Sequence, residues 1–167
     1  MRQEQELHDY VTARRPALFR SAFLLCGDRD EADDLVQATL VKLILGARRL
    51  RRIDSLDAYA RKTLVNTFIA SRRRFWWREH AYGELPETPL PAYDADTGVA
   101  VRAALAVLSP KQRAVLVLRY WEDLSVAATA DLLGLPESTV RSHSARGIAA
   151  LRGLLPSDTH ELQGDAR

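Results

Sequence analysis

Hydrophobic residues recur at helical spacing in two blocks of this chain. The first predicted helix covers residues 5–26, where apolar side chains return every three or four positions. Pro16 falls inside this pattern and predicts a bend or an interruption. Gly27 is expected to end the helix, and Asp28 with Glu31 three positions later has the spacing of a cap for the next one.

A second predicted helix covers residues 31–50. Its apolar stripe consists of Leu35, Val36, Leu40, Leu43 and Ile44. Its other faces carry Asp33, Asp34, Gln37 and Lys42. Acidic side chains in the first turn and basic ones at the end stabilise a helix through its dipole. The two aspartates therefore have a purely structural interpretation beside a binding one.

A third predicted helix, residues 55–74, turns Leu56, Tyr59, Ala60, Leu64 and Phe68 inward. Its remaining faces and the run that follows carry Arg61, Lys62, Asn66, Thr67, Arg72, Arg73, Arg74 and Trp76. Arginines beside aromatic rings can pair with phosphates and stack on unpaired bases. Alternatively, one or both tryptophans of this run complete the core while the arginines are solvated.

Residues 82–98 read YGELPETPLPAYDADTG, with three prolines, four acids and no basic residue. This composition predicts a flexible acidic linker. The chain is therefore expected to be all-α, with two small helical domains at residues 1–80 and 99–155. Residues 81–98 join them, and residues 156–167 form a polar tail.

The second domain has the capping and turn residues of a helix-turn-helix. Ser109, Pro110 and Gln112 have the spacing of a capping box, and the helix they open is expected to run to Tyr120. The next predicted helix, residues 125–133, ends at Gly134, and Pro136 opens a third. Such spacing favours a tight turn between two crossed helices.

The third helix of this unit presents hydroxyl and guanidinium groups near its N-terminus, namely Ser138, Thr139, Arg141, Ser142 and Arg146. These groups can reach base edges and phosphates when a helix enters a major groove. The alternative is a small helical bundle whose polar face is only solvated.

Composition excludes several classes of protein. The chain has 167 residues, 47% of them hydrophobic, and a net charge of +2, without an apolar run long enough to span a membrane. We expect a cytoplasmic protein. A single cysteine, Cys26, excludes an internal disulfide, and the four scattered histidines lack metal-ligand spacing, so no metal or cofactor is expected. The sequence shows no set of residues typical of an enzyme active site.

Three motifs, in this order, carry a family resemblance. They are DEADDLVQATLVKL, then LDAYARKTLVNTFIASRRR, and after the linker LSPKQRAVLVLRYWEDLSVAATADLLGLPESTVRSHSARGIAALR. Together they resemble the extracytoplasmic-function (ECF) group of bacterial RNA polymerase sigma factors, in particular its actinobacterial sigma-E-like members. The resemblance spans residues 5–153. The sequence departs from the group's common pattern at Ala70, Thr129 and Ser144, where an acid and two aliphatic residues are usual.

This resemblance implies a role for each candidate set. Asp33, Asp34, Gln37 and Lys42 would contact core RNA polymerase. Arg61, Lys62, Asn66, Thr67, Arg72, Arg73, Arg74 and Trp76 would recognise and open promoter DNA at the minus-ten element. Ser138, Thr139, Arg141, Ser142 and Arg146 would read the minus-thirty-five element as duplex. Many members are held by an anti-sigma factor, so such a protein is a candidate partner.

The main alternative is a stand-alone transcriptional regulator with the same helix-turn-helix and an N-terminal sensing or dimerising domain. It would bind promoter duplex by itself, whereas a sigma factor of this type would bind duplex poorly until core polymerase is added.

Overall fold

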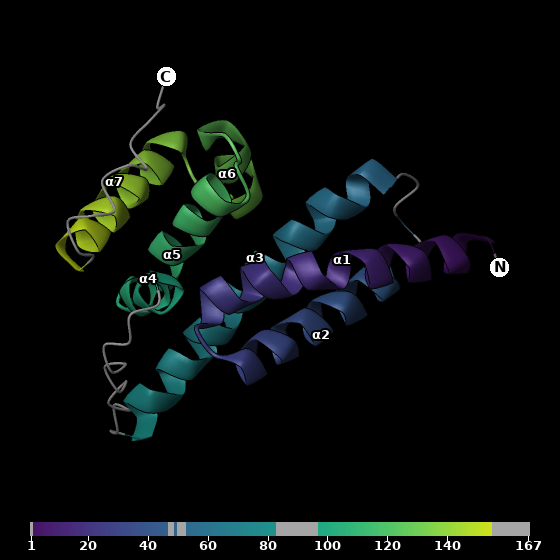
Figure 1. Cartoon of the computed structure of the whole chain (residues 1–167), viewed down its shortest axis with the longest axis horizontal. Coiled ribbons are helices and arrows are strands. Elements are labelled where there is room, and N and C mark those ends of the chain that lie inside the picture. Colours follow the sequence, from purple (N-terminus) through teal and green to yellow (C-terminus); the bar gives the residue numbers. More distant parts are fainter. Residues whose placement is uncertain (1, 47–48, 50–52, 83–96, 155–167) are drawn as a thin grey trace.

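A computed structural model describes residues 2–46, 49, 53–82 and 97–154 of the chain (Figure 1). Within these ranges the regular structure is entirely helical, which confirms the all-α prediction. The predicted linker falls largely on residues 83–96 and the predicted tail on residues 155–167, both outside the described residues.

Three long helices build the N-terminal part, namely α1 (Arg2–Cys26), α2 (Arg29–Gly46) and α3 (Ile53–Tyr82). Figure 1 shows that α1, α2 and α3 run beside one another. The interruption predicted at Pro16 does not occur, since α1 continues through that residue. Val11 and Leu18, on either side of the proline, pack against the buried cluster shared with α2 and α3, and this packing offsets the loss of one backbone hydrogen bond.

The predicted junction between the first two helices is confirmed. Gly27 takes a φ of 73°, in the left-handed region that favours glycine. Asp28 Oδ1 then accepts a hydrogen bond of 2.9 Å from the backbone N–H of Glu31. The ends of the next two helices differ from prediction, because α2 stops at Gly46 and α3 runs on to Tyr82.

The C-terminal part contains α4 (Thr97–Ala106), α5 (Pro110–Leu116), α6 (Val126–Leu133) and α7 (Glu137–Leu154). The capping box is formed as predicted: Ser109 Oγ accepts from the N–H of Gln112 at 3.3 Å, and Gln112 Oε1 accepts from the N–H of Ser109 at 3.4 Å. Gly134 ends α6 with a φ of 64°, so α6 and α7 form the expected helix-turn-helix.

A π-helical turn, η2 (Val117–Trp121), was not predicted. It continues α5, and the N–H of Glu122 donates to the carbonyl of Val117 at 2.9 Å, five residues back. The extra residue in such a turn changes the direction of the side chains that follow. Here it precedes Glu122, whose carboxylate reaches the N-terminal helices.

One continuous hydrophobic core joins the two parts of the chain. Leu25, Leu43 and Phe68 from the N-terminal helices belong to the same buried cluster as Ala114 and Leu118 of the C-terminal part. Two smaller clusters complete the C-terminal helices. The sequence predicted two small helical domains joined by a linker, and the structure adds a packed interface between them.

Candidate nucleic-acid and protein-binding faces

The exposed face of α7 collects all five candidate residues of the helix-turn-helix. Ser138, Arg141, Ser142 and Arg146 are exposed, and Thr139 is partly buried. A weak ion pair at 3.5 Å joins Arg141 Nη2 to Glu137 Oε2, and the Arg141 side chain is 64% exposed. Arg141 is therefore available to a ligand.

The opposite face of α7 is held by close packing. Val140 is fully buried against Val115 and Ala130. Gly147 is also buried, and a Cβ atom at this position would lie 2.8 Å from Leu116 Cδ1. A side chain at this position would displace the buried Leu116, so the close approach of α7 to α5 favours glycine here, a residue that the sequence analysis did not single out.

A mixed polar and apolar stripe runs along the exposed side of α2. Asp33, Asp34 and Gln37 are exposed, as their place outside the apolar stripe predicts. The stripe continues into Val41, Ile44 and Leu45, which are 55%, 53% and 75% exposed. Residues 34, 37, 41 and 45 follow helical spacing along one face.

This patch corrects the predicted apolar stripe, because Ile44 points to solvent and not into the core. Adjacent large apolar side chains on a surface are typical of an interaction site. Lys42, by contrast, turns away from the stripe, and its Nζ donates to Thr67 Oγ1 of α3 at 2.9 Å.

Some of the α3 candidates are exposed, and others contact residues elsewhere in the chain. Lys62, Asn66, Arg73 and Arg74 are exposed. Thr67 is buried at the contact with Lys42, and Arg61 pairs with Glu122 at 3.2 Å. The side chain of Trp76 lies outside the described ones.

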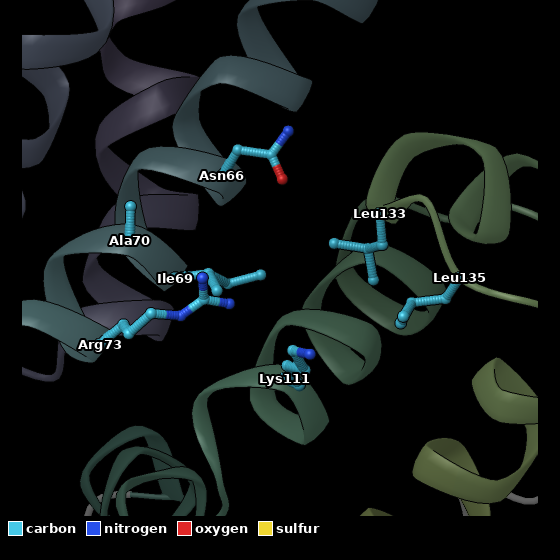
Figure 2. Close-up of a pocket in the computed structure, with 7 residues that line it drawn as sticks. All are labelled: Asn66, Ile69, Ala70, Arg73, Lys111, Leu133 and Leu135. Carbon is cyan, nitrogen blue, oxygen red and sulfur yellow. The ribbon is translucent and has the colours of Figure 1, made fainter. Parts of the chain in front are cut away.

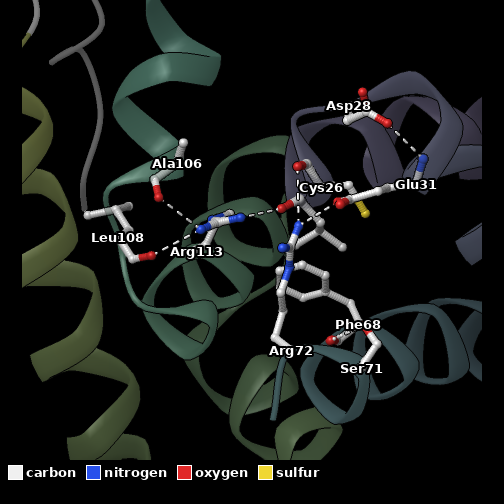
Figure 3. Close-up of polar contacts among 10 residues, drawn as sticks. Cys26, Asp28, Glu31, Phe68, Ser71, Arg72, Ala106, Leu108 and Arg113 are labelled. Carbon is white, nitrogen blue, oxygen red and sulfur yellow. Dashed lines mark hydrogen bonds and ion pairs between the residues drawn. The ribbon is translucent and has the colours of Figure 1, made fainter. Parts of the chain in front are cut away.

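Arg72 occupies a structural position (Figure 3). Its Nη2 lies 2.8 Å from Glu31 Oε2 and 3.3 Å from the carbonyl oxygen of Cys26, and its guanidinium carbon is 5.5 Å from the centre of the Phe68 ring. These contacts join α3 to the α1–α2 junction. Burial raises the pKa of the neighbouring Cys26 thiol to about 11, so this thiol is neutral at physiological pH.

Within the described ranges, no group of three or more His, Cys, Asp or Glu residues is placed to hold a metal ion. None of the helices described is both long and apolar enough to cross a membrane.

Two family matches cover most of these helices. Residues 10–78 match Sigma-70 region 2, and residues 98–151 match Sigma-70, region 4. The first match contains the stripe on α2 and the α3 candidates, and the second contains the helix-turn-helix. Fold and faces thus define a sigma factor of the sigma-70 class.

Individual relatives narrow this class. The chain is 37% identical over 177 residues to the RNA polymerase sigma-E factor of Streptomyces avermitilis, covering 97% of this chain and 93% of that protein. It is 32% identical over 142 residues to the ECF RNA polymerase sigma factor SigM of Mycobacterium tuberculosis, covering 83% and 71% respectively. The chain belongs to the ECF group of bacterial RNA polymerase sigma factors, which confirms the resemblance seen in the sequence.

A solved structure has a similar arrangement of helices. It is the sigma factor RpoE in complex with the anti-sigma factor NepR from Bartonella quintana, with a TM-score of 0.75 and 26% sequence identity. The match covers 92% of this chain and 99% of that one. It therefore includes helices from both parts of the molecule.

Proposed function

We propose that this chain acts in the cytoplasm as a non-catalytic initiation subunit, which binds core RNA polymerase and directs it to specific promoters. The observation that carries the proposal is that separate helices of one sigma-70-type chain present faces of different chemistry. The α2 stripe suits a protein partner, and the α7 face suits duplex DNA.

The polymerase contact centres on Asp33, Asp34 and Gln37. Aspartate and glutamine side chains give directional polar contacts, and Val41, Ile44 and Leu45 add apolar area that is exposed in the free chain. An apolar centre with a polar rim is the usual composition of a protein interface. Lys42 lies at the edge of this interface, where it bonds Thr67.

DNA recognition falls to two other helices. We assign minus-thirty-five readout to Ser138, Thr139, Arg141, Ser142 and Arg146 on α7. We assign minus-ten readout to the α3 residues Arg61, Lys62, Asn66, Arg73 and Arg74, with Trp76 as a candidate stacking residue. Thr67 and Arg72 support this surface from within, because their described contacts are to other parts of the chain.

We propose an anti-sigma factor as a further partner of this chain. Support comes from the solved relative, a sigma factor in complex with the anti-sigma factor NepR. The likeness covers 92% of this chain and 99% of that one, so the helices that such a partner would contact have a similar arrangement here.

The test is co-elution of the purified chain with core RNA polymerase in gel filtration, followed by run-off transcription from a promoter library. The variant Asp34→Arg with Gln37→Ala is expected to lose core binding and specific transcripts. A matched control exists on α1, where Gln5 Nε2 donates to Asp9 Oδ1 at 3.0 Å on an exposed face. Asp9→Arg with Gln5→Ala makes the same chemical change away from the stripe and should retain both activities.

Binding of the unaltered chain to promoter duplex without polymerase, together with failure to bind core, would instead establish a stand-alone regulator. Equal loss of core binding in both double variants would refute the assignment of the α2 stripe.

A further inference from the structure

A small cavity lies between α3 and the C-terminal helices, with a volume of about 250 Å³ (Figure 2). Figure 2 shows its residues on two sides. They are Asn66, Ile69, Ala70 and Arg73 of α3 on one side, and Lys111, Leu133 and Leu135 on the other. Sites for drug-sized ligands usually measure about 300–1,000 Å³, so this space suits a smaller organic molecule.

Two cations line the cavity, and no lining carboxylate balances them. Arg73 comes from α3 and Lys111 from α5, and both residues are exposed. Neither forms an ion pair with another described residue, and none of the described residues that line the cavity is acidic. Two like charges on opposite sides of a cavity repel each other, whereas an anion between them is attracted to both. The cavity is therefore suited to an anion that is held from both sides.

The rest of the lining gives the cavity an apolar part. Ile69, Leu133 and Leu135 are each partly buried, so some of their apolar surface remains accessible. A planar or aliphatic group that covers this surface removes it from water, which is favourable. Asn66 adds a side-chain amide, which can both donate and accept a hydrogen bond. A few polar groups on an apolar lining are the usual composition of a small-molecule site.

Ala70 stands where the ECF group usually has an acidic residue. The position lies three residues before Arg73 on the same helix, a spacing at which side chains meet, so a carboxylate here would pair with that arginine. Alanine provides no such partner for the guanidinium of Arg73. This departure from the group's pattern therefore leaves the cavity open to an external anion.

We propose that this cavity binds a small phosphate monoester that carries an apolar or aromatic group. The phosphate lies between Arg73 and Lys111, and the apolar group covers Ile69, Leu133 and Leu135. A phosphate monoester suits two cations, because it carries a charge of about −1.5 to −2 at pH 7 and three strong acceptor oxygens. A carboxylate has a single negative charge and balances only one of them.

A bound ligand also affects promoter recognition, a consequence that rests on the function proposed above. Asn66 and Arg73 belong to the α3 residues assigned to minus-ten DNA. The ligand occupies the side chains that DNA needs, so the two compete. Transcription initiation therefore decreases as the concentration of the ligand rises.

Nuclear magnetic resonance of the isotope-labelled free chain tests the site, with phenyl phosphate as the probe. We expect saturable shifts centred on the residues that line the cavity, with a dissociation constant on the order of 1 mM for so small a ligand. Inorganic phosphate lacks the ring and benzyl alcohol lacks the phosphate, so each should bind more weakly. Adenosine monophosphate and hexyl phosphate carry a base or an alkyl chain, and the tighter of the two identifies a nucleotide or a lipid-like source of the ligand.

Position 70 offers a matched pair of variants. Ala70→Glu introduces a carboxylate near Arg73, and Ala70→Gln introduces an uncharged side chain of nearly the same size. We expect Ala70→Glu to bind phenyl phosphate about tenfold more weakly than Ala70→Gln, the effect of losing one hydrogen bond to a charged group. Arg73→Met should lose a similar factor, whereas Arg74→Met, at the adjacent exposed position outside the cavity lining, should retain affinity. All the substituted positions are exposed, so the fold is expected to be retained.

Each outcome decides one part of the proposal. Shifts that spread over the surface without saturation would overturn the site, as would equal affinities of the two Ala70 variants or equal losses in Arg73→Met and Arg74→Met. Binding of hexyl phosphate and adenosine monophosphate no tighter than that of inorganic phosphate would overturn the apolar contact.

Run-off transcription with core polymerase tests the competition separately. Phenyl phosphate should inhibit the unaltered chain more strongly than Lys111→Met, and equal inhibition of both would refute the competition. The binding measurements contain neither polymerase nor DNA. Failure of the chain to bind core would therefore overturn the proposed function and leave the ligand site standing.

Discussion

Thr129 has a buried hydroxyl to which no other described group forms a hydrogen bond. The residue lies on α6 and is fully buried, and its Oγ1 atom has no hydrogen-bond partner within the described part of the chain. Its backbone N–H is satisfied by the carbonyl of Ser125 at 2.9 Å. The sequence already marks this position as unusual, because related helices have isoleucine or leucine here. We predict that Thr129→Val increases stability.

The expected size follows from the chemistry of burial. An unsatisfied buried polar group costs about 1–3 kcal/mol. Valine keeps the β-branch and nearly the same volume, so the substitution removes that cost without opening a cavity. We take the lower part of the range, about 1–2 kcal/mol, because small adjustments of the helix relieve part of the cost of the unsatisfied threonine hydroxyl. For a chain of this size, each kcal/mol raises Tm by about 2–4 °C.

Urea denaturation followed by far-UV circular dichroism measures the change, with Thr39→Val as a matched control. Thr39 of α2 is equally buried, but its Oγ1 donates to the carbonyl of Leu35 at 2.8 Å. Loss of this bond should leave stability unchanged or lower it by up to about 1 kcal/mol. The reasoning is refuted if Thr129→Val is no more stable than the unaltered chain, or if both variants shift equally.

Two further predictions concern α7. Gly147→Ala should lower the free energy of unfolding by about 1–3 kcal/mol, because its Cβ meets a buried leucine of α5. The control is Gly153→Ala, where a Cβ meets nothing within 4 Å; in the same urea titration it should raise the free energy of unfolding by up to about 1 kcal/mol. Burial and two neighbouring cations lower the pKa of His143, so the unfolded chain takes up this proton more readily than the folded one. Stability should therefore fall as pH drops below about 6.5, the ordinary histidine pKa. His143→Gln should flatten this dependence between neutral and mildly acidic pH. An unchanged slope in this variant would contradict the assignment of the pH dependence to His143.

Much of the fold could be predicted from short stretches of sequence. The Ser109 capping box, the left-handed glycines Gly27 and Gly134, and the exposed face of α7 are all found where the sequence places them. Caps depend on residues three or four positions apart, and helical periodicity is set within a few turns. Such features are local, so the sequence alone determines them.

The role of a charged side chain was less predictable. Arg72 and Arg73 are adjacent and chemically identical, yet Arg72 binds Glu31 and the Cys26 carbonyl while Arg73 is exposed at the cavity. One residue along a helix rotates a side chain by about 100°. Which of two neighbouring arginines faces a partner therefore depends on what packs against the helix.

Exposure on α2 was also decided by tertiary packing. Val36 and Leu43 are fully buried against the neighbouring helices, whereas Val41, Ile44 and Leu45 are exposed beside Asp34 and Gln37. A helix with apolar residues on most of its faces does not indicate from its sequence which of them a neighbour will cover. Which apolar residues of α2 form the exposed stripe was therefore decided by the packing of α1 and α3 against the others.

The sequence by itself thus determined the helices, their caps, the helix-turn-helix and the family. Only the tertiary structure decided that Arg113 and Glu122 join the two domains, since their partners Leu25 and Ser21 lie 88 and 101 residues away in the chain. The π-helical turn that precedes Glu122 buries Val117 and Leu118 in the core that both domains share. Contacts over such separations form when distant helices bury common apolar surface, which no local pattern encodes.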